Sequence, residues 1–405
     1  MARFLAIWPA SETVKHVRLR EDAPCVDHEL CMTRLLSRRA LLSVAAAGIA
    51  AAACGSDPAA PGGPPLRERA AARGLVYGAA GDVELTTNQQ LGTTFAREAG
   101  AFVPEVSLKW AALRPASDTF DFVASDALIA WAGARAILVR GHALAWHQAL
   151  PNWFAGVANE QTAGGLLDAH IAAVAGRYSG RVRSWDVVNE ALDPFSDRDD
   201  GLREESPWLR LLGPAYIARA FVAARESDAT AVLTLNEYGF ENDPGAARKR
   251  ADFLRLIGRL KDSGTPIQAA GLQAAGLQAH LLQNNPRWAE FDATGYSKFL
   301  SELAAMGLQL FVTELDVNDT AFPKDAKTRD AAVASVYRDY LGVALAEPAV
   351  KMVTTWGLSD RTSWIDRSYP RKDGAHARPL PLDAGYQRKA AWEAVATAFD
   401  RAPKR

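Results

Sequence analysis

The sequence predicts an α/β fold, a single (β/α)8 barrel preceded by a signal and linker segment. From Leu75 onward, apolar runs typical of strands alternate with helix-like segments, as in a parallel sheet covered by helices. Two β-branched runs, 185–189 and 311–313, lead directly into Glu190 and Glu314. The carboxyl ends of parallel strands are where such barrels build active sites. The chain of 405 residues is long enough for one large barrel.

Eight runs have the length and composition of buried strands: 75–78, 102–105, 136–141, 182–189, 232–236, a run around 267–280, 308–314 and 351–356. Helical periodicity follows most of them, at 166–178, 216–224, 296–306, 328–345 and 386–399. Asp243 is predicted to cap a further helix, with Pro244 in its first position and Gly264 at its end. A doubly wound open sheet is the alternative, but the segment 78–82 is a poor match to its glycine-rich turn. Together these elements predict a TIM barrel over residues 66–400.

The sixth strand region contains a tandem duplication. Gln268–Leu272 and Gln273–Leu277 carry the same five residues. An odd insertion inside a strand would turn every later side chain to the other face. We therefore expect the second copy to form the strand, because only it is followed by His280, and the first to bulge out or precede the paired strand.

Composition excludes few functions. The net charge of -1 gives no argument for binding nucleic acid or an anionic membrane surface. The three cysteines, Cys25, Cys31 and Cys54, all precede the predicted barrel, which therefore has neither a disulfide framework nor a cysteine metal site. His142 and His147 lack an adjacent acid at metal-binding spacing, so we predict no metal and no cofactor.

The segment before the barrel has the features of an export signal. In residues 32–54, a paired-arginine stretch precedes an apolar run too short to span a membrane, which is typical of a twin-arginine signal. The end of that run is either a small-residue cleavage site or a lipobox that would lipidate Cys54. Residues 55–65 are a Pro/Gly linker, and residues 1–31 are a misassigned or disordered extension. We expect an exported protein that is periplasmic, secreted or lipid-anchored, with a membrane role only through Cys54.

Glu190 and Glu314 form the candidate catalytic pair. Cleavage of a glycosidic bond with retention needs an acid and a nucleophile with carboxyl groups roughly 5–5.5 Å apart. Strand ends on opposite sides of a barrel can aim two carboxylates at one sugar. We expect Asn189 to bond a sugar hydroxyl, and His280 and Asp316 to hold Glu314 ionised. Burial and repulsion from Glu314 would keep Glu190 protonated. Ordinary salt bridges at strand ends would explain either glutamate alone, but not the whole group.

Several segments share the residue patterns of one known family: 185–191 (WDVVNEA), 140–147 (RGHALAWH), 313–316 (TELD), Glu105 with Lys109-Trp110, 200–208, 236–238 and 356–364. Together they resemble glycoside hydrolase family 10, the endo-1,4-β-xylanases. The resemblance implies a retaining endo-hydrolase of β-1,4-xylan in which Glu190 is the acid/base and Glu314 the nucleophile. It also implies a set of sugar-binding residues: Glu105, Lys109, His142, Trp146, Tyr238, Gln278, Trp356 and Trp364. Xylan or xylo-oligosaccharides would be the partner, with no nucleic acid and no protein partner implied.

The chain departs from the family pattern at three places. Val106 stands where the family usually has an asparagine that binds sugar. Gln148-Ala149 replaces the usual Ser-Gln, and Glu237 replaces the more usual aspartate. These departures predict that the chain binds long xylan chains more weakly than a typical member of the family, or that its substrate preference is altered.

Two rival functions stay open at this point. A retaining β-1,4-glucanase would use the same chemistry, but it would need room for a hydroxymethyl group near Trp356 and Trp364. A catalytically weak surface protein that binds sugars is favoured by Val106 and the duplication, and opposed by the intact pair of glutamates.

Overall fold

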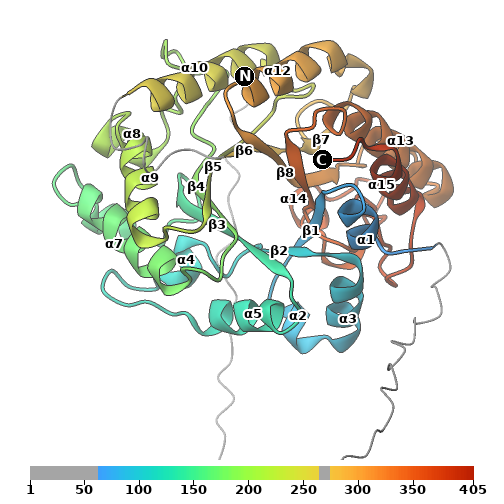
Figure 1. Ribbon diagram of the computed structural model, residues 1–405, viewed down its shortest axis with the longest axis horizontal. Helices are drawn as coiled ribbons and strands as arrows, with labels where there is room; N and C mark the ends of the chain where they lie inside the picture. The colour runs from blue at the N-terminus through green and yellow to red at the C-terminus, as the bar shows by residue number, and fades with distance from the viewer. Residues whose placement is uncertain (1–62, 264–273) are drawn as a thin grey trace, which may run out of the picture. The chain divides into compact units, whose positions relative to one another are not determined.

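A ring of parallel strands forms the centre of the protein. The computed structural model describes residues 63–263 and 274–405. Its strands are β1 (Val76–Gly81), β2 (Ala101–Pro104), β3 (Leu138–Trp146), β4 (Ser184–Asn189), β5 (Val232–Tyr238), β6 (Ala274–Gln278), β7 (His280–Leu281), β8 (Gln309–Val317) and β9 (Val350–Thr355). Strands that are neighbours in sequence pair in parallel, except β6 and β7, which both pair with β8. The pairing of β1 with β9 completes the ring. Only Ala279 separates β6 from β7, so the two act as one interrupted strand. The predicted eight-stranded TIM barrel is thereby confirmed (Figure 1).

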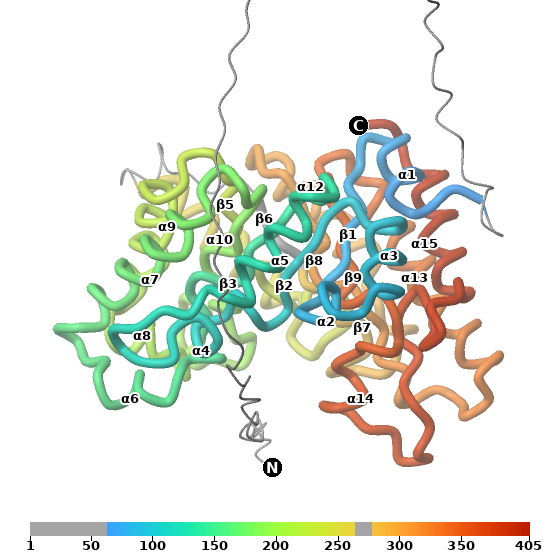
Figure 2. The backbone as a smooth tube through the Cα atoms, turned by 90° about the horizontal axis from the view of Figure 1, so that it is seen from below, coloured from blue at the N-terminus to red at the C-terminus, as the bar shows by residue number. Residues whose placement is uncertain are grey.

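Helices surround this ring. The longer ones are α3 (Gln89–Glu98), α5 (Val123–Gly133), α7 (Ala163–Arg177), α9 (Tyr216–Ser227), α10 (Ala246–Asp262), α12 (Ala293–Ala305), α13 (Ala326–Ala344) and α15 (Ala390–Arg401). The shorter ones are α1 (Leu66–Ala71), α2 (Glu84–Thr87), α4 (Trp110–Leu113), α6 (Phe154–Val157), α8 (Pro207–Leu212), α14 (Ile365–Ser368) and the 3₁₀ turns η1 (Trp288–Glu290) and η2 (Asp360–Thr362). The view across the barrel places α6 and α14 at one end and α1 at the other (Figure 2). The loops that follow the strands therefore build up one end of the barrel.

The predicted helices at 166–178, 216–224, 296–306 and 328–345 correspond to α7, α9, α12 and α13. Two predicted helix starts were wrong. α10 begins at Ala246 rather than at Pro244, because Gly245 has a left-handed φ of 83° that breaks the helical path. α15 begins at Ala390 rather than at Tyr386, which also has a positive φ, of 64°. Both segments are turns that the apolar periodicity does not reveal.

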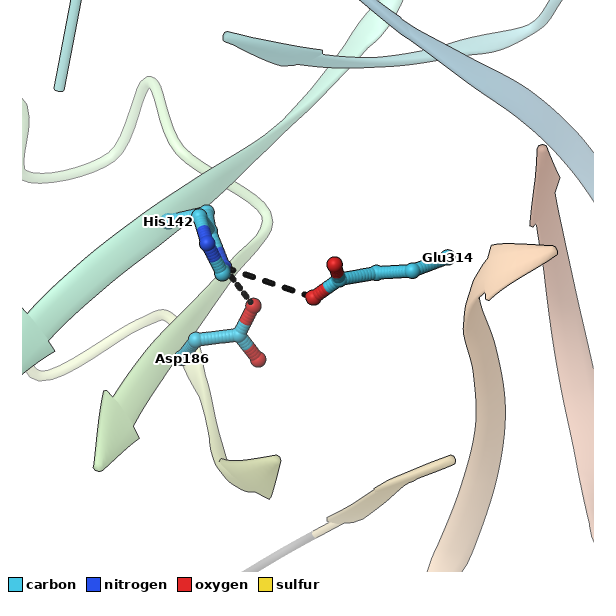
Figure 3. Close-up of side chains that lie close together, drawn as sticks. All are labelled: His142, Asp186 and Glu314. Atoms are coloured by element: carbon cyan, nitrogen blue, oxygen red, sulfur yellow. Dashed lines mark hydrogen bonds and ion pairs between the residues drawn. The ribbon is translucent and has the colours of Figure 1, made fainter. Parts of the chain in front are cut away.

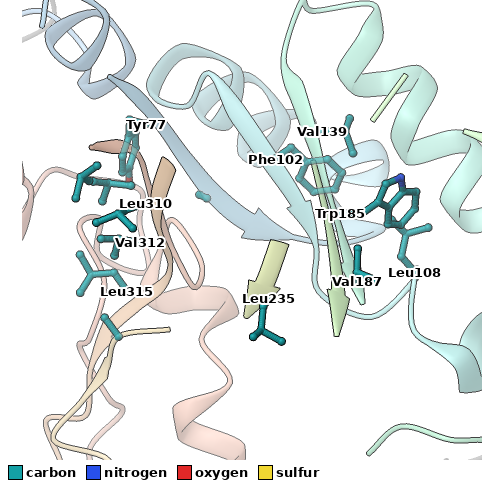
Figure 4. Packing of buried hydrophobic residues seen from close by; sticks show 14 of the residues in the cluster. Tyr77, Phe102, Leu108, Val139, Trp185, Val187, Leu235, Leu310, Val312 and Leu315 are labelled. Atoms are coloured by element: carbon teal, nitrogen blue, oxygen red, sulfur yellow. The ribbon is translucent and has the colours of Figure 1, made fainter. Parts of the chain in front are cut away.

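One hydrophobic core lies between the strands and the helices. Figure 4 shows side chains of β1 to β5 and β8 that contribute to it, among them Phe102, Trp185 and Val312. The predicted face of α10 is buried at Phe253, Leu256, Ile257 and Leu260. Each side chain of this size stabilises the fold by about 1.5–3 kcal/mol when fully buried. Trp110 and Trp185 lie in this core, as the sequence predicts.

Irregular pairing interrupts three strands just before the candidate site. The register shifts lie between His142 and Ala145 in β3, between Asp186 and Val188 in β4, and between Val312 and Leu315 in β8. An extra residue in one strand re-aims the side chains that follow it, and such bulges are common next to active sites. The strict alternation of a strand is therefore lost where the functional residues begin.

The described residues include the second copy of the duplicated segment from Ala274 onward. Ala274 to Leu277 pair with both β5 and β8, as expected of the copy that precedes His280, while the first copy lies outside the described residues. The predicted extension, export signal and most of the linker also lie outside them. Within the described part of the chain, no helix is long and apolar enough to cross a membrane.

Candidate active site

Glu314 lies near the end of β8 and is held from two sides. Only 4% of its surface is exposed. His280 Nε2 lies 3.0 Å from Glu314 Oε2, and the other ring nitrogen of His280 lies 3.0 Å from Asp316 Oδ1. Asn236 Nδ2 donates to Glu314 Oε1 at 2.9 Å. The expected Glu–His–Asp group is therefore assembled, and it fixes the orientation of the Glu314 carboxylate.

The charges around Glu314 keep it ionised. Burial alone would raise its pKa, but the charge of His142, the hydrogen bond and charge of His280, and the charge of Lys109 lower the pKa of Glu314 to about 2. Burial also opposes the charge on His280, yet Asp316 and Glu314 raise the pKa of His280 well above its ordinary value. An imidazolium thus lies between two carboxylates, and Glu314 is an anion throughout the physiological range of pH.

His142 approaches Glu314 from the opposite side of the barrel (Figure 3). Its Nδ1 atom lies 3.0 Å from Asp186 Oδ2 and 3.8 Å from Glu314 Oε1. One ring nitrogen of His142 and one carboxylate oxygen each of Asp186 and Glu314 lie within 4.8 Å of one another. Arg140 forms an ion pair with Asp186, so this carboxylate is already neutralised by a cation. The hydrogen bond between His142 and Asp186 and the ion pair between Asp186 and Arg140 account for the close approach of these side chains.

Glu190 follows the last residue of β4 in a left-handed conformation, with φ 54°. Such backbone is rare for a residue with a side chain and is concentrated at functional sites. Trp146 Nε1 donates to Glu190 Oε2 at 2.9 Å, and Asn189 Nδ2 lies 3.3 Å from Glu190 Oε1. The carboxyl group is half-buried rather than enclosed. The site thus places Glu190 where solvent and a leaving group reach it.

A row of amides joins the two glutamates. Asn189 Oδ1 accepts hydrogen bonds from Asn236 Nδ2 at 2.8 Å and from Gln278 Nε2 at 2.7 Å. The same Asn236 nitrogen contacts Glu314, and Asn189 also contacts Glu190. Two buried amides therefore connect carboxyl groups that are far apart in sequence. The pair lies at one end of one barrel, as the sequence predicts.

The other predicted residues surround this centre. Lys109 Nζ lies 5.0 Å from the ring centroid of Trp146, and burial lowers the pKa of Lys109 although Glu105, Glu314 and Glu190 oppose the shift. The Trp356 ring lies 5.3 Å from that of His142, and Trp364 Nε1 donates to Asp316 Oδ2 at 2.7 Å.

Glu105 lies farther out, beside an exposed cation. Arg367 Nη2 lies 3.5 Å from Glu105 Oε1, and burial raises the pKa of Glu105. The neighbouring Val106 exposes 42% of its surface, and its backbone N–H donates to Asp82 Oδ2 at 2.7 Å. An apolar side chain therefore lies exposed next to a residue of the candidate site, at the position where the sequence lacks an amide.

A pocket of about 180 Å³ opens beyond Glu190. Its lining includes Phe195, Tyr238, Asp243 and Lys249. Tyr238 OH accepts a hydrogen bond from Arg203 Nη2 at 3.0 Å, and Lys249 Nζ lies 3.5 Å from the centroid of the Tyr238 ring. Tyr238 therefore lies on this pocket and contacts Arg203, which is bound to the backbone of Glu190.

Comparison with known proteins assigns the family. Residues 65–398 match the profile of Glycosyl hydrolase family 10. The chain belongs to this family. It is 31% identical to an endo-1,4-beta-xylanase A of Fusarium oxysporum over 79% of this chain and 91% of that one. It is 29% identical to an endo-1,4-beta-xylanase B of Thermotoga neapolitana over 74% and 80% of the two chains. Among solved structures, xylanase 10B of Thermotoga petrophila in complex with xylobiose has a TM-score of 0.72 at 27% identity, covering 83% of this chain and 97% of that one.

Sequence reasoning missed Asp186 and Asn236 as members of the site. Both are buried polar residues inside apolar strands, at 1% and 0% exposure. A polar side chain in a buried strand needs a hydrogen-bonding partner, and this requirement is the signal that could have identified them. Arg203 and Glu237 were not assigned to the site from the sequence, because their contacts join the turn after β4 to the end of β5 and to α10, which are distant in sequence.

Replacing His280 by glutamine should move the acidic limb of the pH profile upward. A nucleophilic carboxylate loses activity as pH falls through its pKa, which is about 2 in the native site. Without the imidazolium, burial is opposed by fewer charges, so we expect the limb to rise from this value toward 4.5, the ordinary value, while His142 and Lys109 still lower it. The measurement is kcat/KM for an aryl β-xylobioside between about pH 3 and pH 8. His376→Gln, which removes an exposed histidine, serves as the control. An unmoved limb in the His280 variant would contradict this electrostatic account.

Proposed function

We propose that this member of family 10 is a retaining endo-1,4-β-xylanase, with Glu190 as acid/base and Glu314 as nucleophile. The observation that carries the proposal is the pair of carboxyl groups joined through Asn189 and Asn236 at the barrel end. Family membership supports the same chemistry, and the relatives named above are xylanases. The substrate would be xylan or xylo-oligosaccharides.

The mechanism uses two displacements at the anomeric carbon. Glu314 attacks this carbon while Glu190 gives its proton to the glycosidic oxygen, so the bond to the leaving sugar breaks and a glycosyl ester forms on Glu314. Glu190, now a carboxylate, takes a proton from water, whose oxygen attacks the same carbon and releases Glu314. The low pKa of Glu314 supports its role as the anion, and the half-buried position of Glu190 supports proton exchange with solvent and leaving group.

Each remaining group has a role consistent with its contacts. His280 and Asp316 orient Glu314, and Asn189 spaces the two glutamates. We assign sugar binding to Glu105, Lys109, His142, Trp146, Tyr238, Gln278, Trp356 and Trp364. The flat faces of the tryptophans suit the C–H groups of a pyranose ring. Gln278 is 1% exposed and bound to Asn189, so it would act through that amide unless substrate displaces it.

Substrate preference tests this proposal. The chain should hydrolyse aryl β-xylobioside faster than aryl β-cellobioside, whereas a glucanase would show the reverse order. The gain in kcat/KM from xylotriose to xylohexaose and xylan should be shallow, because Val106 supplies no amide to the sugar. Val106→Asn should steepen the gain. A steep gain in the native chain would contradict the weakened subsite, and binding without hydrolysis would identify a pure binder.

We further propose that the chain is exported, on the strength of the paired arginines and the apolar run in residues 32–54. The mature product would be periplasmic, secreted or anchored through lipid on Cys54. Fractionation of cells that express the native chain and Cys54→Ala tests this. Activity that stays in the cytoplasm would contradict export, and an unchanged distribution of the variant would contradict lipidation.

A further inference from the structure

The turn that carries Glu190 is held in place by groups outside the catalytic pair. Glu190 has a left-handed backbone, which a residue with a side chain adopts only when its surroundings enforce it. Its own N–H donates to Asn236 O at 2.9 Å. Arg203 Nε donates to Glu190 O at 3.1 Å, and Arg203 Nη2 donates to Leu192 O at 2.7 Å. The direction of the Glu190 side chain therefore depends on contacts made by the residues that follow it.

Glu237 supplies the contact that ties this turn to the barrel. Its Oε2 atom accepts the N–H of Leu192 at 2.8 Å. Its Oε1 atom accepts the N–H of Tyr238 at 3.1 Å and lies 2.8 Å from Lys249 Nζ. Glu237 and Lys249 are each 1% exposed, so neither carries its charge into solvent. The carboxylate thus links the turn after β4 to the end of β5 and to α10.

An ordinary buried ion pair would need only Glu237 and Lys249. The bond to Leu192 is additional, and it reaches a peptide group two residues after the proposed proton donor. A buried carboxylate that accepts hydrogen bonds on both oxygens is fixed in position, and so is the peptide group that it binds. A shift of the turn would displace the Glu190 carboxyl from the leaving oxygen while Glu314, on β8, stayed in place.

We propose that Glu237 is a positioning residue for proton transfer, which holds the left-handed turn so that Glu190 faces the glycosidic oxygen. This inference rests on the proposed function of Glu190. It assigns a role to a position at which the chain departs from its family, where a shorter carboxylate is usual. Glu237 touches no reacting atom, and its hydrogen bond to the Glu190 turn is made to the backbone N–H of Leu192.

The test compares leaving groups that differ in their need for a proton. The phenyl leaving group departs readily only when its oxygen is protonated. Dinitrophenolate departs as the free anion, so cleavage of a dinitrophenyl glycoside does not need proton transfer from Glu190. For Glu237→Gln we expect kcat/KM for phenyl β-xylobioside to fall about 10²-fold, the loss typical of a displaced catalytic group. The value for the dinitrophenyl glycoside should change little. Glu237→Asp, which retains a carboxylate, should recover most of the phenyl activity.

Three comparisons make the result decisive. Rates are divided by the concentration of active sites. This concentration is measured with a dinitrophenyl 2-deoxy-2-fluoro-β-xylobioside, which releases one burst of dinitrophenolate per active site and then turns over slowly. Glu241→Gln is the matched control, because Glu241 is a buried carboxyl group shortly after β5 whose Oε2 accepts the N–H of Phe240. It should leave the ratio of the two rates unchanged. If Glu237→Gln does not fold because Lys249 is left unpaired, Glu237→Gln/Lys249→Met removes both buried charges and gives the same comparison.

The outcomes separate this inference from the function on which it rests. An equal loss on both glycosides, or no loss on either, would overturn the positioning role. Glu190→Ala is the reference and should show the full split between the two substrates. If Glu190→Ala shows the split and Glu237→Gln does not, only the positioning role fails. If Glu190→Ala shows no split, the acid/base assignment fails, and the role of Glu237 fails with it.

Discussion

Glu314→Ala is expected to abolish hydrolysis of xylan while xylohexaose still binds. The variant removes the anion that attacks the anomeric carbon, and no other carboxylate of the site is placed to replace it, because Asp316 is bound to His280 and Trp364. Loss of a nucleophile that acts with its partners as a unit costs at least about 10⁴-fold in kcat. Release of reducing ends measures the rate, and titration calorimetry with xylohexaose measures binding.

Chemical rescue gives the Glu314 prediction its sharpest form. Azide should enter the space left by the side chain and attack an activated β-xylobioside, giving the α-xylobiosyl azide, of inverted configuration. Glu302→Ala, which removes a partly exposed glutamate on α12 that pairs with Lys298 at 3.7 Å, is the control and should hydrolyse xylan normally. Residual xylanase activity in Glu314→Ala near that of the control would refute the assignment of the nucleophile.

Glu190→Ala should show the opposite signature. Xylan hydrolysis is expected to fall about 10³-fold, because both the departure of the sugar and the attack of water lose proton transfer. A dinitrophenyl xylobioside should still react with Glu314 in a rapid first turnover and then stall as the glycosyl ester. Azide needs no general base, so it should restore turnover and give the β-xylobiosyl azide, of retained configuration.

The configuration of the azide product distinguishes the two glutamates, because each variant opens a different face of the sugar. An α product from Glu190→Ala would mean that the two roles are exchanged. An equal loss on xylan and on the dinitrophenyl glycoside, without rescue, would place Glu190 outside the proton-transfer step. These results together test both roles without relying on the geometry.

The barrel and the positions of the two glutamates were predictable because their signals are local. A buried parallel strand is a short apolar run, and Glu190 directly follows one such strand while Glu314 lies near the end of another. His280 was predictable for the same reason, since it follows the copy of the duplicated segment that forms β6. Long helices such as α13 repeat their apolar spacing over several turns, which made them recognisable.

Other features were not predictable because they depend on contacts between distant segments. The bulges in β3, β4 and β8 change which face the residues after them occupy, so alternation alone does not predict the contact between Trp146 and Glu190. The role of Asn236 depends on Asn189 of the neighbouring strand β4 and on Glu314 of β8, which β6 separates from β5. α3 was missed because its polar residues outnumber the apolar ones, and its start is fixed by the Asn88 side chain, which accepts the N–H of Leu91.

The most direct test of the catalytic pair is to locate the covalent intermediate. The protein is treated with a dinitrophenyl 2-deoxy-2-fluoro-β-xylobioside, which forms the glycosyl ester quickly and releases it slowly, and its peptic peptides are sequenced by tandem mass spectrometry. The account predicts one added fluoroxylobiosyl group on the peptide that contains Glu314, and on that side chain. Full hydrolytic activity without any labelled peptide, or a label on a residue other than Glu314, would contradict it.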